Sequence, residues 1–133
     1  MATPFEVFLV TPEREVWSGQ ATIVIARGSE GELGVMNGHA PMLIQLGIGP
    51  LFIQPTAGER VAAAVDGGFL HVMTSGEETR VDVLAEHAEL RDEIDLEQAR
   101  QLKSDAERRM AADHDTEALA DLAKALVRLD LAG

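Results

Sequence analysis

The stretch Arg60-Val61-Ala62-Ala63-Ala64-Val65-Asp66-Gly67-Gly68-Phe69-Leu70-His71-Val72-Met73 contains two short apolar runs separated by Asp66-Gly67-Gly68. Apolar runs of four to eight residues that are bounded by turn residues are typical of buried strands. Asp and Gly are common in tight turns because they tolerate backbone angles that other residues avoid. The stretch therefore predicts two strands, 60–65 and 69–73, joined by a turn.

The same pattern continues on both sides of this stretch. Gly and Pro recur at residues 47–50, 55–58 and 75–76, and Asn37-Gly38 is a strong turn signal. The segments between these turns are rich in residues that favour strands; they are 5–10, 21–26, 31–36, 42–46, 51–54 and 79–84. Short strands at regular spacing predict a β-sandwich or barrel.

Beyond residue 85 the composition changes to helix-forming residues, and 11 of the 12 glycines lie before residue 77. Asp95 can cap a first helix, with Gln98 three residues later, and Asp115 or Thr116 can cap a second. Apolar residues at helical spacing predict one stripe on each helix: Leu96, Ala99, Leu102, Ala106 and Met110, then Leu119, Leu122, Leu126 and Leu129. Residues 111–115 break the pattern, which predicts an antiparallel hairpin.

The predicted fold is therefore of the β + α class. A flattened β-sandwich or barrel occupies residues 1–86, a joint occupies 87–94, and an antiparallel two-helix hairpin occupies 95–133. The stripes on the helices are narrow, and ordering the backbone costs about 1–2 kcal/mol per residue. We therefore expect a marginally stable hairpin that is able to undock from the β domain.

Charge and composition exclude several classes of function. The net charge is −12, from 23 acidic and 11 basic side chains, which disfavours binding to nucleic acid or to anionic membranes. The chain has no cysteine, and no apolar run approaches the roughly 18 residues of a membrane-spanning helix. The N-terminus lacks the basic start and apolar run of a signal peptide. These features predict a soluble, cytosolic protein without metal or thiol chemistry based on cysteine.

The sequence offers little catalytic chemistry. The four histidines, His39, His71, His87 and His114, are scattered, and surface or loop positions explain them best. The glycine-rich segment 28–34 lacks the Gly-Lys-Ser/Thr ending of a P-loop and leads into a strand instead of a helix. A small β-fold enzyme that uses Glu32 and His39 is an alternative, but no third group orients the pair.

The segment Gly28-Ser-Glu-Gly-Glu-Leu-Gly-Val-Met-Asn-Gly-His-Ala-Pro-Met-Leu43 closely resembles the signature of the epsilon subunits of bacterial F-type ATP synthases. The residues that carry the likeness are Leu33-Gly34, an apolar pair, Gly38-His39-Ala40-Pro41 and Met42-Leu43. The Gly-Gly-Phe strand start at 67–69, the segment Val81–Ala85 and the order of β domain, acidic joint and two helices also match. The resemblance covers essentially the whole chain.

The resemblance implies a non-catalytic subunit of the central stalk, which turns with the rotor and couples proton flow to ATP synthesis. The β domain would hold the gamma subunit and rest on the c-ring, with Glu32, His39, Pro41 and Met42 at or near these contacts. The location would be peripheral, on the cytoplasmic face of the bacterial inner membrane. No cofactor would be required.

The hairpin resembles the regulatory element of the family, which inhibits ATP hydrolysis when it extends along gamma into the alpha/beta hexamer. Four basic residues of the first helix would meet acidic loops of that hexamer: Arg100, Lys103, Arg108 and Arg109. The alternative is pairing within the helix, such as Asp105 with Arg109 at i,i+4.

Some epsilon subunits bind ATP on the docked hairpin, which makes an ATP-sensing module the alternative function. The residues that match the corresponding motif are Glu89, Ile94, Asp95, Ala99 and Arg128. Gln98 stands where the motif has arginine, and Lys124 replaces another expected arginine. Because an amide cannot bind phosphate as a guanidinium does, we expect weak ATP binding at most, with Asp95 acting simply as a helix cap.

Overall fold

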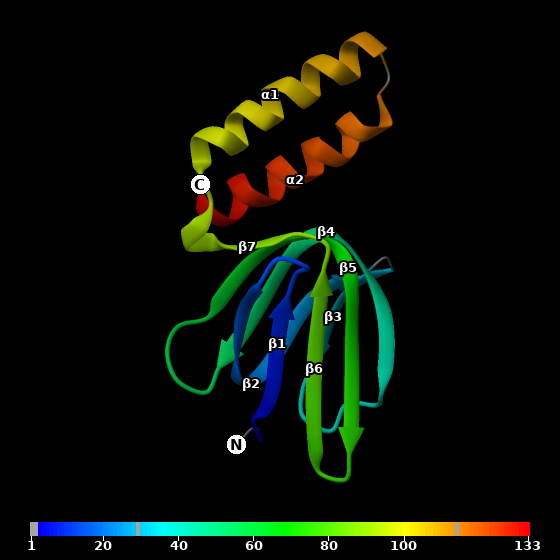
Figure 1. Ribbon diagram of the computed structural model, residues 1–133, viewed down its shortest axis with the longest axis vertical. Coiled ribbons are helices and arrows are strands. Elements are labelled where there is room, and N and C mark those ends of the chain that lie inside the picture. The colour runs from blue at the N-terminus through cyan, green and yellow to red at the C-terminus, as the bar shows by residue number, and fades with distance from the viewer. Residues whose placement is uncertain (1–2, 29, 114) are drawn as a thin grey trace.

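The computed structural model describes residues 3–28, 30–113 and 115–133, and it consists of a closed β domain with a helical hairpin on one end (Figure 1). His114 lies outside the described residues. The strands of the β domain are β1 (Phe5–Val10), β2 (Glu15–Gly28), β3 (Gly31–Val35), β4 (Met42–Pro55), β5 (Val61–Ser75), β6 (Glu78–Ala85) and β7 (Ala88–Leu90). The remaining elements are the 3-10 turn η1 (Arg91–Glu93) and the helices α1 (Leu96–Asp113) and α2 (Thr116–Ala132). The predicted class, a β-sandwich or barrel followed by two helices, is confirmed.

Five strands form a closed circuit, in the order β1-β6-β5-β4-β2 and back to β1. Strand β3 is added to β2, and β7 is added to β5. The pairings are antiparallel apart from that of β1 with β6, which is parallel. A closed circuit leaves few unpaired strand edges, which protects a β domain of this size from edge-to-edge association.

The predicted breaks at residues 47–50 and 66–68 are wrong, because β4 and β5 run through them as long strands. Their pairing keeps one register from Met42 opposite Val72 to Ile53 opposite Val61. Gly67 and Gly68 have φ of +84° and +129°, so they bend β5 without ending it. The half of β5 before the bend pairs with β7, and the half after it pairs with β6.

The β domain also extends further than predicted. Residues 88–90, which we placed in the joint, form β7 against β5, with Ala63 opposite Leu90 and Val65 opposite Ala88. Ala88 is buried, so this short strand belongs to the core of the sandwich. The connection to the helices is therefore the turn η1 followed by Ile94 and Asp95.

The core of the sandwich is mainly aliphatic. The largest side chains that are fully buried in it are Leu9, Leu51, Ile53, Leu70, Val7, Val24, Val35, Val72, Val81 and Val83. They come from every strand of the closed circuit and from β3, so the domain has a single shared core.

Both helices begin where the sequence predicts. The Asp95 carboxylate accepts a hydrogen bond from the Gln98 amide at 3.1 Å, and the Asp115 carboxylate accepts one from the Glu117 amide at 2.9 Å. Each contact satisfies a backbone donor that the first turn of a helix leaves free. The helices form the expected antiparallel hairpin, in which α2 lies between α1 and the sandwich (Figure 1).

The apolar stripe predicted for α2 does not all face the protein. Leu119 and Leu126 are 59% and 45% exposed, whereas the buried positions of α2 are Ala118, Ala125 and Arg128. The small side chains of Ala118 and Ala125 allow α2 to pack closely against its neighbours. On α1 the prediction holds better, because Ala99 and Ala106 are buried and Leu96, Leu102 and Met110 are half-buried.

Among the described residues, no helix has the length and hydropathy needed to cross a bilayer.

Candidate interaction surfaces

The loop that follows β3 lies at the end of the sandwich opposite the helices, beside the β5–β6 turn (Figure 1). The Gly38 amide donates to the Thr79 hydroxyl at 2.8 Å, and the Thr74 hydroxyl donates to the His39 carbonyl at 2.8 Å. The two threonine hydroxyls are 3.0 Å apart and hydrogen-bonded to each other. Because Thr79 is buried, these bonds fix the loop firmly to the sandwich.

The four residues predicted at partner contacts have different surroundings. Pro41 is exposed on this loop, and His39 is half-buried with Nδ1 2.8 Å from the Ala40 carbonyl. Met42 packs against the core, so little of it is available to a partner. Glu32 is exposed on β3, opposite Arg27 of β2 and at the other end of the strand from the loop.

A pocket of about 630 Å³ opens at this end of the sandwich, between the N-terminal segment and the β5–β6 turn. Acidic and polar side chains line much of it, including Glu6, Glu77 and Glu78, with Arg80 at the same rim. The Asn37 amide reaches the Glu77 carbonyl at 3.5 Å, which connects the pocket wall to the loop. The loop and the pocket together make a polar, acidic end surface.

The outer face of β4, β5 and β6 carries exposed apolar side chains that the sequence analysis missed. Leu43, Phe69 and Leu84 are 63%, 47% and 50% exposed. Phe69 lies directly opposite Leu84 across the β5–β6 pair. Next to them is a pocket of about 390 Å³, lined by Val10, Thr11, Pro12, Gly68, Phe69, Leu84, Ala85 and Glu86. Contiguous apolar surface of this kind marks an interaction site in a soluble protein.

The basic residues of α1 are engaged mainly within the hairpin. Arg100 pairs with Glu97 at 3.3 Å, and Arg108 pairs with Asp105. Arg109 contacts Asp121 of α2 at 2.9 Å and Asp115 at 3.3 Å. Asp105 therefore pairs with the residue at i+3, and not with Arg109 at i+4 as the sequence suggested. Lys103 is half-buried on the same helix.

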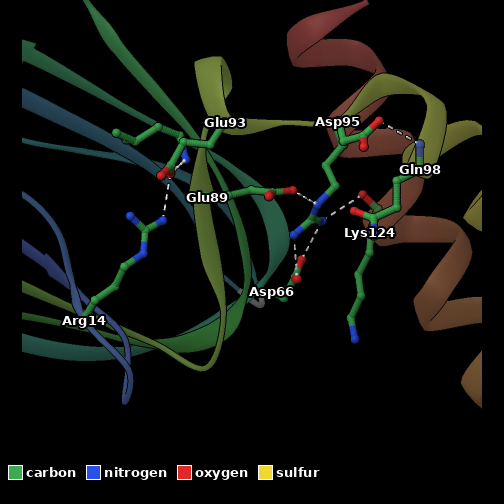
Figure 2. A network of polar contacts seen from close by, with 9 residues as sticks. Arg14, Asp66, Glu89, Glu93, Asp95, Gln98 and Lys124 are labelled. Carbon is green, nitrogen blue, oxygen red and sulfur yellow. Dashed lines mark hydrogen bonds and ion pairs between the residues drawn. The ribbon is translucent and has the colours of Figure 1, made fainter.

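Arg128 of α2 joins the hairpin to the sandwich through a buried ionic cluster (Figure 2). Its Nη1 and Nη2 donate to the two carboxylate oxygens of Asp66 at 2.9 and 2.7 Å. Its Nε donates to Glu89 at 2.5 Å, and Nη1 also donates to the Lys124 carbonyl at 2.9 Å. Burial alone would lower the pKa of Arg128, but the hydrogen bonds to Asp66 and Glu89 outweigh it and raise that pKa.

Of the residues predicted to bind nucleotide, Glu89 and Arg128 belong to this cluster and are already paired with each other. Figure 2 draws Asp95 in the same view, where its carboxylate accepts the hydrogen bond from the Gln98 amide that caps α1. Ala99 is buried, and Ile94 is half-buried beside Asp95. Since carboxylates surround Arg128, a phosphate would have to displace Asp66 and then face like charges.

A second ion pair holds the joint to the start of the sandwich. Arg14 contacts Glu93 at 2.7 Å, and the same carboxylate accepts a hydrogen bond from the Leu90 amide at 2.9 Å (Figure 2). The hydrogen bond from Arg14 is the main cause of a lowered pKa for Glu93. The pair is partly exposed, so its contribution to stability is modest.

The part of the chain that the structure describes contains no group of three or more His, Asp or Glu side chains placed to hold a metal ion.

Residues 4–91 match the family described as "ATP synthase, Delta/Epsilon chain, beta-sandwich domain". Among similar proteins, the ATP synthase epsilon chain of Thermobifida fusca is 46% identical over 125 residues, which are 92% of this chain and 88% of that protein. The epsilon chain of Streptomyces griseus is 47% identical over 111 residues, covering 80% and 86%. That of Brevibacillus brevis is 44% identical over 104 residues, covering 78% and 76%.

Two solved structures share the fold. A chain in the cryo-EM structure of Euglena gracilis mitochondrial ATP synthase, OSCP/F1/c-ring in rotational state 1, aligns with a TM-score of 0.75 at 23% identity, covering 95% of this chain and 78% of that one. A chain in the central stalk/c-ring structure of Tetrahymena thermophila mitochondrial ATP synthase aligns with a TM-score of 0.59 at 17% identity, covering 99% and 98%.

Proposed function

Because the chain belongs to the family of ATP synthase epsilon chains, we propose that it is the central-stalk subunit of a bacterial, proton-translocating F-type ATP synthase. It turns with the rotor and couples the rotation of the c-ring to ATP synthesis. It has no catalytic role of its own and requires no cofactor. Its location is peripheral, on the cytoplasmic face of the inner membrane.

The exposed apolar face of β4, β5 and β6 is the observation that carries this proposal. A face with Leu43, Phe69 and Leu84 exposed costs solubility unless a partner covers it. An aromatic residue beside an apolar pocket is the usual form of an interface hot spot. We assign this face to binding of the gamma subunit, with which this chain must turn as one body.

The opposite end surface suits the c-ring. Its loop carries exposed Met36 and Pro41, and hydrogen bonds from the loop to the Thr79 hydroxyl and from the Thr74 hydroxyl to the loop hold it in place. A loop that is held rigidly can transmit torque, because it keeps its conformation under load. The acidic pocket beside it favours a partner loop with positive charge.

The hairpin is the proposed regulatory element, which inhibits hydrolysis when it extends into the alpha/beta hexamer. Arg100 and Arg108 make only exposed pairs on α1. Exposed ion pairs contribute little stability, so these arginines can readily pair with carboxylates of a partner instead. Binding of ATP to the docked hairpin is the second candidate function, and we expect it to be weak because Asp66 and Glu89 already neutralise Arg128.

The test is binding of the purified chain to recombinant gamma, measured by calorimetry. Replacing Phe69 and Leu84 together by serine should weaken binding about tenfold or more, since each side chain is a candidate hot spot. Leu119→Ser is the matched control, because Leu119 is also an exposed apolar residue, at 59%, but lies on α2. Unchanged affinity of the Phe69/Leu84 variant would remove this face from the gamma interface.

A second experiment distinguishes the apolar face of β4, β5 and β6 from the end surface that carries the loop. Pro41→Asp should leave binding to gamma intact, while it lowers proton-driven ATP synthesis in reconstituted vesicles. If Pro41→Asp instead abolished binding to gamma, the assignment of the two surfaces would be reversed.

A further inference from the structure

Two of the four polar or charged residues that are buried in the described structure are charged, and they are partners in one ion pair. Asp66 lies on β5 and Arg128 on α2, and each is 7% exposed. They come from the two parts of the molecule, the sandwich and the hairpin. A buried charge is costly unless it is paired and hydrogen-bonded, so each needs the other.

All three nitrogens of the Arg128 guanidinium donate hydrogen bonds. Nε, Nη1 and Nη2 all donate, to Glu89, to Asp66 and to the Lys124 carbonyl of its own helix. Two parallel bonds to Asp66 fix the guanidinium plane, and the bond from Nε adds a second carboxylate. The hydrogen bond to the Lys124 carbonyl fixes the guanidinium relative to the backbone of α2.

The other side chains that α2 buries are small or only partly covered. Besides Arg128, its buried residues are Ala118 and Ala125, and Leu122 and Leu129 are half-buried. Leu119 and Leu126 are each about half exposed to solvent. Helix α1 packs mainly on α2 and does not add a second extended contact with the strands.

We infer that Arg128, Asp66 and Glu89 form a latch that holds the two helices as one unit on the sandwich. The carboxylates belong to β5 and β7, so the receptor for the guanidinium is built into the sandwich whether or not the hairpin is present. Loss of the Arg128 charge releases both helices together, because α1 is held through α2. Release leaves Asp66 and Glu89 as neighbouring negative charges, which favours the return of the arginine.

The latch does not require any bound ligand. The carboxylates of Asp66 and Glu89 already neutralise Arg128. They occupy the positions that an anionic ligand would need in order to contact the guanidinium. The docked state of the isolated full-length chain is therefore an intrinsic property of these three residues.

Hydrogen exchange of the full-length chain tests the latch. Arg128→Ala should raise exchange of the α2 amides on the order of a hundredfold, because it leaves the buried Asp66 carboxylate unpaired. Exchange in β1 and β6 should not change, which shows that the sandwich stays folded. Arg100→Ala is the matched control, since Arg100 is 59% exposed and pairs only within α1.

Chemical rescue separates a latch from simple packing. Millimolar guanidinium chloride should restore protection of α2 in the Arg128→Ala variant, and sodium chloride at the same concentration should not. A packing role for the aliphatic part of Arg128 would show no difference between the two salts, and that result would overturn the latch.

A double-mutant cycle covers the case in which single variants fold poorly. Asp66→Asn alone should also loosen α2, and the double variant D66N/R128A should be no looser than the worse single variant. If the two single effects multiply in the double variant, the residues act independently and the proposal is wrong. The result bears on this chain alone and does not depend on binding to gamma.

Discussion

Gly68 is the position where a single methyl group should damage the sandwich most. Its φ is +129°, and a Cβ built there lies 2.2 Å from the Leu84 carbonyl oxygen and 2.8 Å from the Ala85 Cα. Both neighbours are backbone atoms of β6, which is paired with β5 at this point. They cannot turn aside as a flexible side chain would, so Gly68→Ala must separate the two strands.

The expected cost follows from two terms. Holding a residue with a side chain at a positive φ costs on the order of 1–3 kcal/mol. Opening the strand pair near Gly68 adds the loss of backbone hydrogen bonds, each worth about 0.5–1.5 kcal/mol. We therefore expect Gly68→Ala to destabilise the chain by about 3 kcal/mol or more, a large share of the roughly 5–15 kcal/mol that stabilises an ordinary domain.

Two other glycines provide matched controls. Gly76 has φ +64° and Gly47 has no positive φ, and a Cβ at either meets no atom within 4 Å. Gly76→Ala should cost about 1–2 kcal/mol from its backbone angle alone. Gly47→Ala should be near neutral, or stabilise by up to about 1 kcal/mol, because alanine restricts the unfolded chain.

Urea unfolding measures all three variants, with far-UV circular dichroism and the fluorescence of the single tryptophan, Trp17, as probes. Trp17 packs against the core, so its emission reports the sandwich. If Gly68→Ala costs no more than Gly76→Ala, the strand pair yields more easily than the geometry indicates, and the reasoning is refuted.

Three further predictions address other parts of the chain. Asp95→Ala should cost about 1 kcal/mol by removing the cap of α1, seen as faster exchange of the Gln98 amide and its neighbours; unchanged exchange would mean that the cap contributes nothing. Glu93 has a lowered pKa, so its pairing with Arg14 stabilises the fold above the ordinary pKa of 4.5, and this stability is lost as pH falls below that value. Glu93→Gln should therefore reduce the loss of unfolding free energy at acid pH. The same pH dependence in the variant would contradict the assignment. Leu70→Ala should cost roughly 2–5 kcal/mol in urea unfolding, since Leu70 is fully buried, and a cost under about 1 kcal/mol would show that the core closes around the cavity.

Much of the fold was predictable because its signals are local. The strands 5–10 and 79–84 and the first residues of both helices agree with the structure within one or two residues. Residues 66–68 were misassigned because Asp-Gly-Gly is equally suited to a turn and to a bend inside a strand. The choice between them depends on pairing with β4 and β6, which are distant in the sequence.

The functional surfaces were harder to predict for the same reason. Asp66 looked like a turn residue, and nothing near it in the sequence indicates a partner 62 residues away. Phe69 and Leu84 could have been found, because they alternate with the core residues Leu70 and Val83 and must therefore face outward. A strand with apolar residues on both faces indicates that its outer face is covered by a partner, and this signal was present in the sequence.

The exposed leucines of α2 explain why an ionic latch is needed at the hairpin. Leu119 and Leu126 recur seven residues apart and so share one side of α2, yet docking leaves about half of each side chain exposed. Fully burying a leucine is worth about 1.5–3 kcal/mol, so the two half-exposed leucines together leave about that much apolar stabilisation unused, whereas breaking a buried ion pair costs about 3–5 kcal/mol. A partner that covers these two leucines would therefore offset part, and not all, of the stabilisation that the Arg128 cluster contributes. A helix that buried all its leucines on the sandwich would be held regardless of Arg128, and it could not respond to such a partner.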